Sequence, residues 1–198
     1  MDFGSVPDWI VAIAAAMASW QGIKSLNTWR REEAGRRRME LAEVALSEFY
    51  EARDIFKWVR TPAGEGRETA VAQPAPDDPE GRIQAQRDVY YPILKRLADD
   101  GEFFGRMRAR RYRVQALFGP AGAEPYDIIN AVHGKVALAA KMLVQTQQEG
   151  TPSEAETARS GEWQDTVWDD AEESDEINDR IELAVRKAEE VFRPTISV

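Results

Sequence analysis

The sequence predicts an all-α protein, a helical bundle of about four to five helices with a long N-terminal helix able to extend into a membrane. In every periodic segment the apolar residues repeat at intervals of three and four positions, as on one face of a helix, and never at two. Ala, Leu and Val fill these positions, with Lys, Arg, Glu and Asp between them, which favours helix over strand. The 198 residues suffice for one compact bundle at 29–198, preceded by an apolar helix at 1–28.

Residues 1–28 are predicted to form a helix that anchors the chain in a membrane. Pro7 and Asp8 suit a helix start. The strictly apolar stretch 9–18 covers only ten residues, whereas a membrane span needs about 20. Aromatic and basic residues nevertheless stand where the two membrane interfaces would lie, and we predict six interface residues: Trp9, Trp20, Lys24, Trp29, Arg30 and Arg31.

The charges on either side of this helix predict its orientation, because basic residues concentrate on the cytoplasmic side of membranes. Asp2 and Asp8 precede the apolar stretch, and five arginines follow within 30–38. We therefore expect a single-pass membrane protein with a cytoplasmic body, and the lipid bilayer as a partner. The alternative is a soluble cytoplasmic protein whose first helix packs in its own core or in a dimer interface. A cleaved signal peptide fits less well, since the leading residues are acidic.

The helical pattern then continues without a breaker as far as Thr61 and Pro62. Its apolar residues form a seam of the coiled-coil type, made by Ala42, Ala45, Phe49, Ala52, Phe56 and Val59. The following stretch, 61–80, is rich in Pro and Gly and has no apolar period, so we predict a loop there.

The rest of the bundle is expected to contain four helices, at 81–98, 102–118, 124–148 and 163–192. Pro92 is expected to kink the first of them, and Gly119 to Gly122 are expected to form the turn between the second and third. A second loop is predicted at 149–160. Pro194 is expected to stop the last helix.

Residues suited to catalysis or to metal and cofactor binding do not assemble into any known pattern. His133 is the single histidine, and it lacks the preceding Glu of a di-iron bundle and the neighbours of a zinc helix. The chain has no cysteine, no phosphate-binding glycine loop and no Gly-x-Ser-x-Gly motif. The acids between 162 and 179 lack the order of a calcium loop. We therefore predict no catalytic, cofactor or metal residues, and a protein that is not an enzyme.

Five arginines without an intervening acid form the best candidate for a specific interaction: Arg106, Arg108, Arg110, Arg111 and Arg113. Steps of about 100° per residue place Arg110 and Arg111 at the rim of the apolar face of this helix. We expect these two to be partly buried and paired with carboxylates of other helices, the acidic C-terminal helix being one candidate. Anionic lipid headgroups and nucleic acid are alternative partners, but the pI of about 4.8 disfavours nucleic acid.

Several short phrases carry a resemblance over most of the chain: the Asp8-Trp9 apolar opening with basic residues after it, Tyr91-Pro92-x-x-x-Arg96-Leu97, Phe118-Gly119, and Phe192-Arg193-Pro194. The chain resembles uncharacterised bacterial proteins with one N-terminal membrane helix and a helical cytoplasmic body. The resemblance implies an anchor and no particular activity. We expect a membrane-anchored interaction or regulatory protein that binds a protein partner or a second copy of itself, or alternatively a soluble helical binding module.

Overall fold

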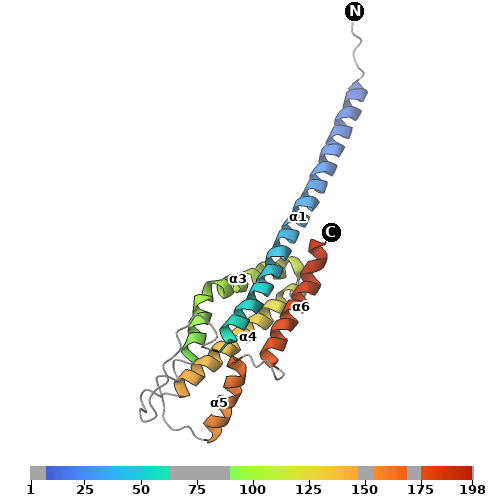
Figure 1. Cartoon of the computed structure of the whole chain (residues 1–198). Helices are drawn as coiled ribbons and strands as arrows, with labels where there is room; N and C mark the ends of the chain where they lie inside the picture. Colours follow the sequence, from blue (N-terminus) through green and yellow to red (C-terminus); the bar gives the residue numbers. More distant parts are fainter. Residues whose placement is uncertain (1–7, 63–89, 147–153, 169–174, 198) are drawn as a thin grey trace, which may run out of the picture. The chain divides into compact units, whose positions relative to one another are not determined.

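The computed structural model describes residues 8–62, 90–146, 154–168 and 175–197, without the side chains of 8–16, 18–28 and 154–158. Within these ranges all regular structure is helical and no strand occurs, which confirms the all-α class (Figure 1). The helices are α1 (Asp8–Arg60), a helical segment at 90–99, α3 (Gly101–Phe118), α4 (Pro120–Thr146), α5 (Glu154–Val167) and α6 (Glu176–Ile196). The predicted loop at 61–80 lies outside the described residues from 63 onward.

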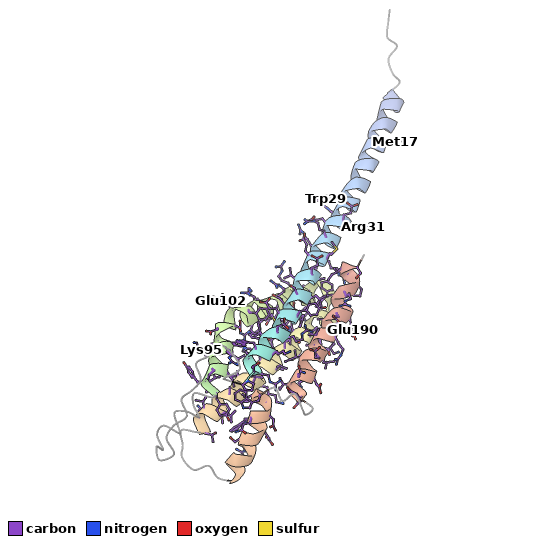
Figure 2. The ribbon with its side chains drawn as sticks, viewed as in Figure 1. Met17, Trp29, Arg31, Lys95, Glu102 and Glu190 are labelled. Carbon is purple, nitrogen blue, oxygen red and sulfur yellow. The ribbon has the colours of Figure 1, made fainter. Side chains whose placement is uncertain are left out.

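The chain divides into two units, Met1–Leu41 and Ala42–Val198. In the first unit Met17, Trp29, Arg30 and Arg31 are exposed, and Figure 2 shows Trp29 and Arg31 on the α1 ribbon. Neighbouring turns of the helix are joined by ion pairs, with Arg36 and Arg37 both bound to Glu33. The side chains of Trp9, Trp20 and Lys24, predicted to lie at membrane interfaces, are outside the described residues.

The predicted anchor can be compared with the apolar length of the described helices. None of them, over the part of the chain that the structure describes, is both long enough and apolar enough to cross a membrane. The short apolar stretch at 9–18 accounts for this, because it reaches only about half of the length that a spanning helix needs. The predicted membrane span is therefore not supported.

The second unit is built around the apolar seam of α1, whose six predicted residues are all buried. Aromatic side chains of the seam contact three other helices. The ring of Phe49 lies 4.7 Å from that of Tyr126 in α4 and 6.4 Å from that of Phe192 in α6, measured between centroids. Phe56 lies 5.3 Å from Phe104 in α3. α4 in turn packs against α3, α5 and α6, and its buried face completes the core together with the seam of α1.

The connection between α3 and α4 is a single residue, Gly119, whose φ of 73° lies in the left-handed region that favours glycine. Its backbone N–H donates to the carbonyl of Gln115 at 2.9 Å and ends α3. Pro120 then starts α4 directly, since a proline at the first helical position loses no hydrogen bond. The expectation of a four-residue turn from Gly119 to Gly122 was wrong, because Gly122 belongs to the first turns of α4.

Gly122 provides the first testable prediction. A Cβ built on this buried residue would lie 2.7 Å from Cβ of Phe118 and 2.8 Å from Cγ1 of Val114, both in α3. Gly122→Ala should therefore push the two helices apart and lower the free energy of unfolding by about 1–3 kcal/mol. Gly134→Ala is the matched control in the same helix. A Cβ there meets nothing within 4 Å, so this change should stabilise the helix by about 0.5–1 kcal/mol. Urea unfolding measures both, and equal effects would contradict the close approach.

The prediction of a single helix at 163–192 was wrong, because the structure has two helices in this part of the chain. α5 begins at Glu154, inside the predicted loop at 149–160, and ends at Val167, whereas α6 begins at Glu176. Asp175 is the N-cap of α6, its Oδ1 accepting from the backbone N–H of Ile177 at 2.9 Å and of Asn178 at 3.2 Å. Pro194 does not stop α6 but lies within its last turn. Asp175 stands in a dense run of acids, so the sequence pattern alone did not distinguish it as the residue that starts a helix.

Candidate functional site

Arg60, in the last turn of α1, is the organising side chain at one end of the second unit, where it is only 2% exposed. Its Nε donates to the carbonyl of Thr166 at 3.2 Å, and its Nη2 to the carbonyl of Trp168 at 2.5 Å. The Nη1 atom donates to Oδ2 of Asp175 at 2.5 Å. One guanidinium therefore caps the C-terminal carbonyls of α5 and holds the N-cap of α6.

The Arg60–Asp175 contact shifts the pKa of the carboxyl group. Burial alone would raise the pKa of Asp175, but hydrogen bonds from Arg60 and from the backbone of Asn178 and Ile177 outweigh it and hold the pKa below its usual value. Because the folded-state pKa is lowered, the charged carboxylate stabilises the fold above the unfolded-state pKa of about 3.9, and this contribution is lost as pH falls through the folded-state pKa.

Asp175→Asn should therefore destabilise the protein at pH 7, and its difference from the wild type should shrink as pH falls below about 4. Urea unfolding of both proteins at pH 7, 5 and 3 measures that difference. Asp179→Asn is the matched control, because Asp179 is an exposed acid in the first turn of the same helix. A difference that stays constant with pH would show that the Asp175 carboxylate has no special role.

A second buried arginine, Arg96, belongs to the helical segment at 90–99 and caps the end of α1. Its Nη1 donates to the carbonyl oxygens of Trp58, Val59 and Thr61 at 3.0, 3.3 and 2.7 Å. The guanidinium also lies over the indole of Trp58, 4.4 Å from the ring centroid. Arg60 and Arg96 thus fix the same end of the bundle from two sides.

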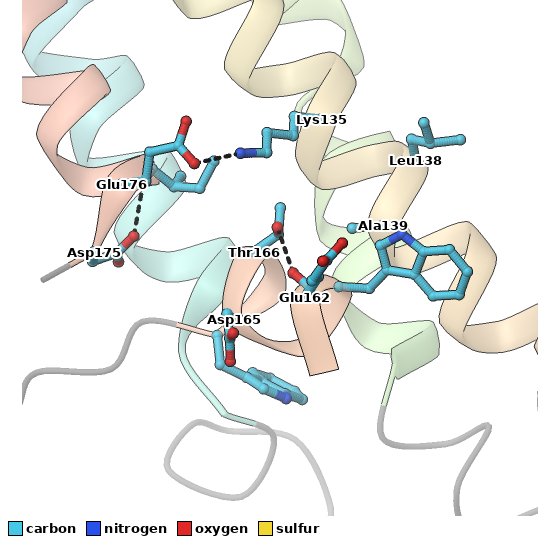
Figure 3. A pocket seen from close by; sticks show the side chains of 11 residues that line it. Lys135, Leu138, Ala139, Glu162, Asp165, Thr166, Asp175 and Glu176 are labelled. Atoms are coloured by element: carbon cyan, nitrogen blue, oxygen red, sulfur yellow. Dashed lines mark hydrogen bonds and ion pairs between the residues drawn. The ribbon is translucent and has the colours of Figure 1, made fainter. Parts of the chain in front are cut away.

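A pocket of about 500 Å³ opens beside Arg60, between α4, α5 and α6 (Figure 3). Figure 3 shows Lys135 of α4 directed toward Glu176 of α6, with Glu162 and Thr166 of α5 near them. Eleven residues line the pocket: Lys135, Leu138, Ala139, Glu162, Trp163, Asp165, Thr166, Trp168, Asp175, Glu176 and Ile177. Sequence analysis missed this pocket, because it depends on the break between α5 and α6.

The charged groups of the pocket are only partly neutralised. Nζ of Lys135 lies 2.8 Å from Oε2 of Glu176, and Asp175 is held by Arg60. The carboxylates of Glu162 and Asp165 make no ion pair with any residue that the structure describes. Two carboxylates that line the pocket therefore have no ion-pair partner among the described residues, although Nη2 of Arg60 reaches the backbone carbonyl of Asp165 at 3.4 Å.

Among the described residues no group of three or more His, Asp or Glu side chains could hold a metal ion. His133 is half-buried with its ring 4.4 Å from that of Phe104. Burial, and then the charge of Arg108, lower the pKa of His133 and so favour the neutral imidazole. His133 therefore acts as part of the packed wall between α3 and α4.

The predicted behaviour of Arg110 and Arg111 is confirmed, since both are partly buried and each is paired with a carboxylate of another helix. Arg110 pairs with Glu48 of α1, which is 5% exposed, and Arg111 lies 2.6 Å from Asp127 of α4. The suggestion that the acidic C-terminal helix supplies these carboxylates was wrong. Because one residue joins α3 to α4, the start of α4 folds back beside Arg111 and places Asp127 there.

The other three arginines of the predicted cluster are exposed. No ion pair of Arg106, Arg108 or Arg113 exists with any residue in the described ranges. Arg106 only lies over the ring of Phe103, 5.9 Å from its centroid. Tyr112, 70% exposed, and Leu117, 49% exposed, project from the same helix. The cluster thus divides into two groups. Arg110 and Arg111 hold α3 in the bundle, and the other three arginines give the exposed side of α3 its positive charge.

Comparison of the chain with protein-family models, with curated proteins and with solved structures finds no match. The resemblance to bacterial proteins with one membrane helix thus stays a prediction. One of the motifs that carry this resemblance has a structural role. Arg96 of the Tyr91-Pro92-x-x-x-Arg96-Leu97 segment is the buried cap of α1.

Proposed function

We propose that this protein is a non-enzymatic helical binding module that docks an acidic segment of a protein partner on the outer face of α3. The observation that carries the proposal is the set of three exposed arginines without a carboxylate partner among the described residues. They belong to a chain whose net charge is −9. An unneutralised basic face on an acidic protein is a favourable place for an acidic partner.

The order of side chains across α3 supports a docking face. With about 100° per residue, Arg106 and Arg113 lie on one rim of the outer face and Arg108 on the opposite rim. Between the rims lie Ala109, Tyr112 and Ala116, all exposed, and the first turn of the helix adds one exposed acid, Glu102, beside Arg113 in projection. Small and aromatic residues in the centre with charges at the edge are the usual arrangement of protein interfaces, where Tyr and Arg contribute much of the binding energy.

A protein partner fits this face better than nucleic acid or an anionic membrane. Both of these carry dense negative charge, which the acidic remainder of the chain would repel. A short acidic peptide needs only the α3 face itself. The exposed ring of Tyr112 would also contact apolar side chains of a peptide. The proposal is independent of the predicted membrane anchor.

Fluorescence anisotropy with labelled poly-glutamate tests the proposal. The wild type should bind in low salt, and replacing Arg106, Arg108 and Arg113 together by Gln should weaken binding about tenfold, as the loss of three exposed charge pairs implies. The matched control replaces Arg36 and Arg37 by Gln, which removes exposed arginines outside α3 and should leave binding nearly unchanged. Equal losses, or tighter binding to duplex DNA or to phosphatidylserine vesicles, would contradict a protein-docking face on α3.

A further inference from the structure

We propose that the pocket between α4, α5 and α6 is a binding site for a small organic cation, an alkylammonium group with its apolar tail. The pocket combines two tryptophans and an apolar wall with two carboxylates that form no ion pair within the described ranges. Its volume of about 500 Å³ is within the usual range of sites for small molecules, about 300–1,000 Å³. This site is separate from the outer face of α3 and does not depend on the function proposed there.

The charge of the lining selects a cation. Asp175 is paired with Arg60, and Glu176 is paired with both Lys135 at 2.8 Å and Arg180 at 3.3 Å, so that these groups add no net negative charge. Glu162 and Asp165 remain, both lining the pocket and both without an ion-pair partner in the described part of the chain. Two uncompensated negative charges attract an ammonium group and repel a carboxylate or a phosphate.

The aromatic residues of the lining favour an organic cation over a metal ion. Trp163 and Trp168 both line the pocket, and tryptophan is the side chain whose ring attracts ammonium groups most strongly. Divalent metals instead need several oxygen ligands at once, and no group of three suitable side chains occurs among the described residues. Leu138, Ala139 and Ile177 supply the apolar surface for an alkyl tail.

The pocket is also held in place before any ligand arrives. The guanidinium of Arg60 binds the carbonyl oxygens of Thr166 and Trp168 and the carboxylate of Asp175, and all three residues line the pocket. Trp168 packs further against the ring of Tyr90, 5.8 Å between centroids. A lining fixed in this way loses little conformational entropy on binding.

Titration with n-butylammonium chloride, followed by the indole N–H signals in a ¹H–¹⁵N NMR spectrum, tests the proposal. The signals of Trp163 and Trp168, assigned through Trp163→Phe and Trp168→Phe, should shift and saturate. The signals of Trp29 and Trp58, which do not line the pocket, serve as internal references. Sodium chloride at equal concentration should cause no such shifts, and neither should 1-butanol, the neutral analogue, if the positive charge matters.

Glu162→Gln combined with Asp165→Asn should raise the Kd for n-butylammonium about tenfold, because it removes both unpaired charges. Both residues are exposed and outside the core, so the variant should remain folded. Glu124→Gln is the matched control, since Glu124 pairs with Lys187 away from the pocket, and it should not alter the Kd. An unchanged Kd in the double variant, equal shifts with 1-butanol, or no saturable shift at all would overturn the proposal.

Discussion

Arg60→Met is expected to lower the free energy of unfolding by about 3–5 kcal/mol, as breaking a buried ion pair from one side usually does. Asp175 would lose its counter-charge while remaining largely buried. The carbonyl oxygens of Thr166 and Trp168 would lose the donors that satisfy them at the end of α5. Methionine fills a similar volume, so the loss reports on charge and hydrogen bonds rather than on a cavity.

Two further variants, measured by urea unfolding, separate the contribution of the Arg60 charge to stability from that of its hydrogen-bond donors. Arg60→Lys keeps the charge beside Asp175 but cannot supply the fork of donors that reaches both helices, so an intermediate loss is expected. Arg53→Met removes a half-exposed arginine two turns earlier in α1. Among the described residues Arg53 forms an ion pair with Asp54 at 3.6 Å and lies 5.7 Å from the ring centroid of Tyr50, so the change should cost about 0–1 kcal/mol. Similar losses for Arg60→Met and Arg53→Met would show that Arg60 does not organise the fold.

The amino-acid pattern predicted most of what depends on local periodicity. The intervals of three and four along α1 identified six residues that the structure buries, because one helix face must pack against the rest of the bundle. The end of α1 at Arg60 also agrees with the breaker at Thr61 and Pro62. The angular position of Arg110 and Arg111 predicted their burial correctly, since the direction of a side chain on a helix follows from its position in the sequence.

Features that depend on how the helices are arranged in space could not be predicted in the same way. Arg60 contacts Thr166, Trp168 and Asp175, all more than 100 residues away in the chain. No local pattern distinguishes such an arginine from an exposed one in the last turn of a helix. The pocket depends on the same long-range contacts. The start of α6 at Asp175 did have a local signal, an acid able to cap the helix, but the surrounding acids concealed it.

Arg110→Ala is expected to cost about 2–3 kcal/mol of unfolding free energy, less than the loss of a fully buried partner, because Arg110 itself is partly exposed. The cost arises at Glu48, whose carboxylate is buried and would keep only the hydroxyl of Tyr126, which donates to its Oε2 at 3.4 Å. Arg111→Ala should cost less, since its partner Asp127 is half exposed to solvent. Arg108→Ala, without an ion pair in the described residues, should be nearly neutral.

A second substitution separates the loss of attraction from the cost of a stranded charge. Glu48→Gln in the Arg110→Ala background removes the buried negative charge, and the amide can still accept from the hydroxyl of Tyr126. We therefore expect this double variant to recover part of the stability that Arg110→Ala loses, as measured by thermal and urea unfolding. If the double variant is instead less stable than Arg110→Ala alone, the Glu48 carboxylate must have other stabilising contacts. If the three single variants all unfold like the wild type, Arg110 belongs with the solvent-facing arginines of α3, and the partner-binding face is then larger than the three residues assigned to it.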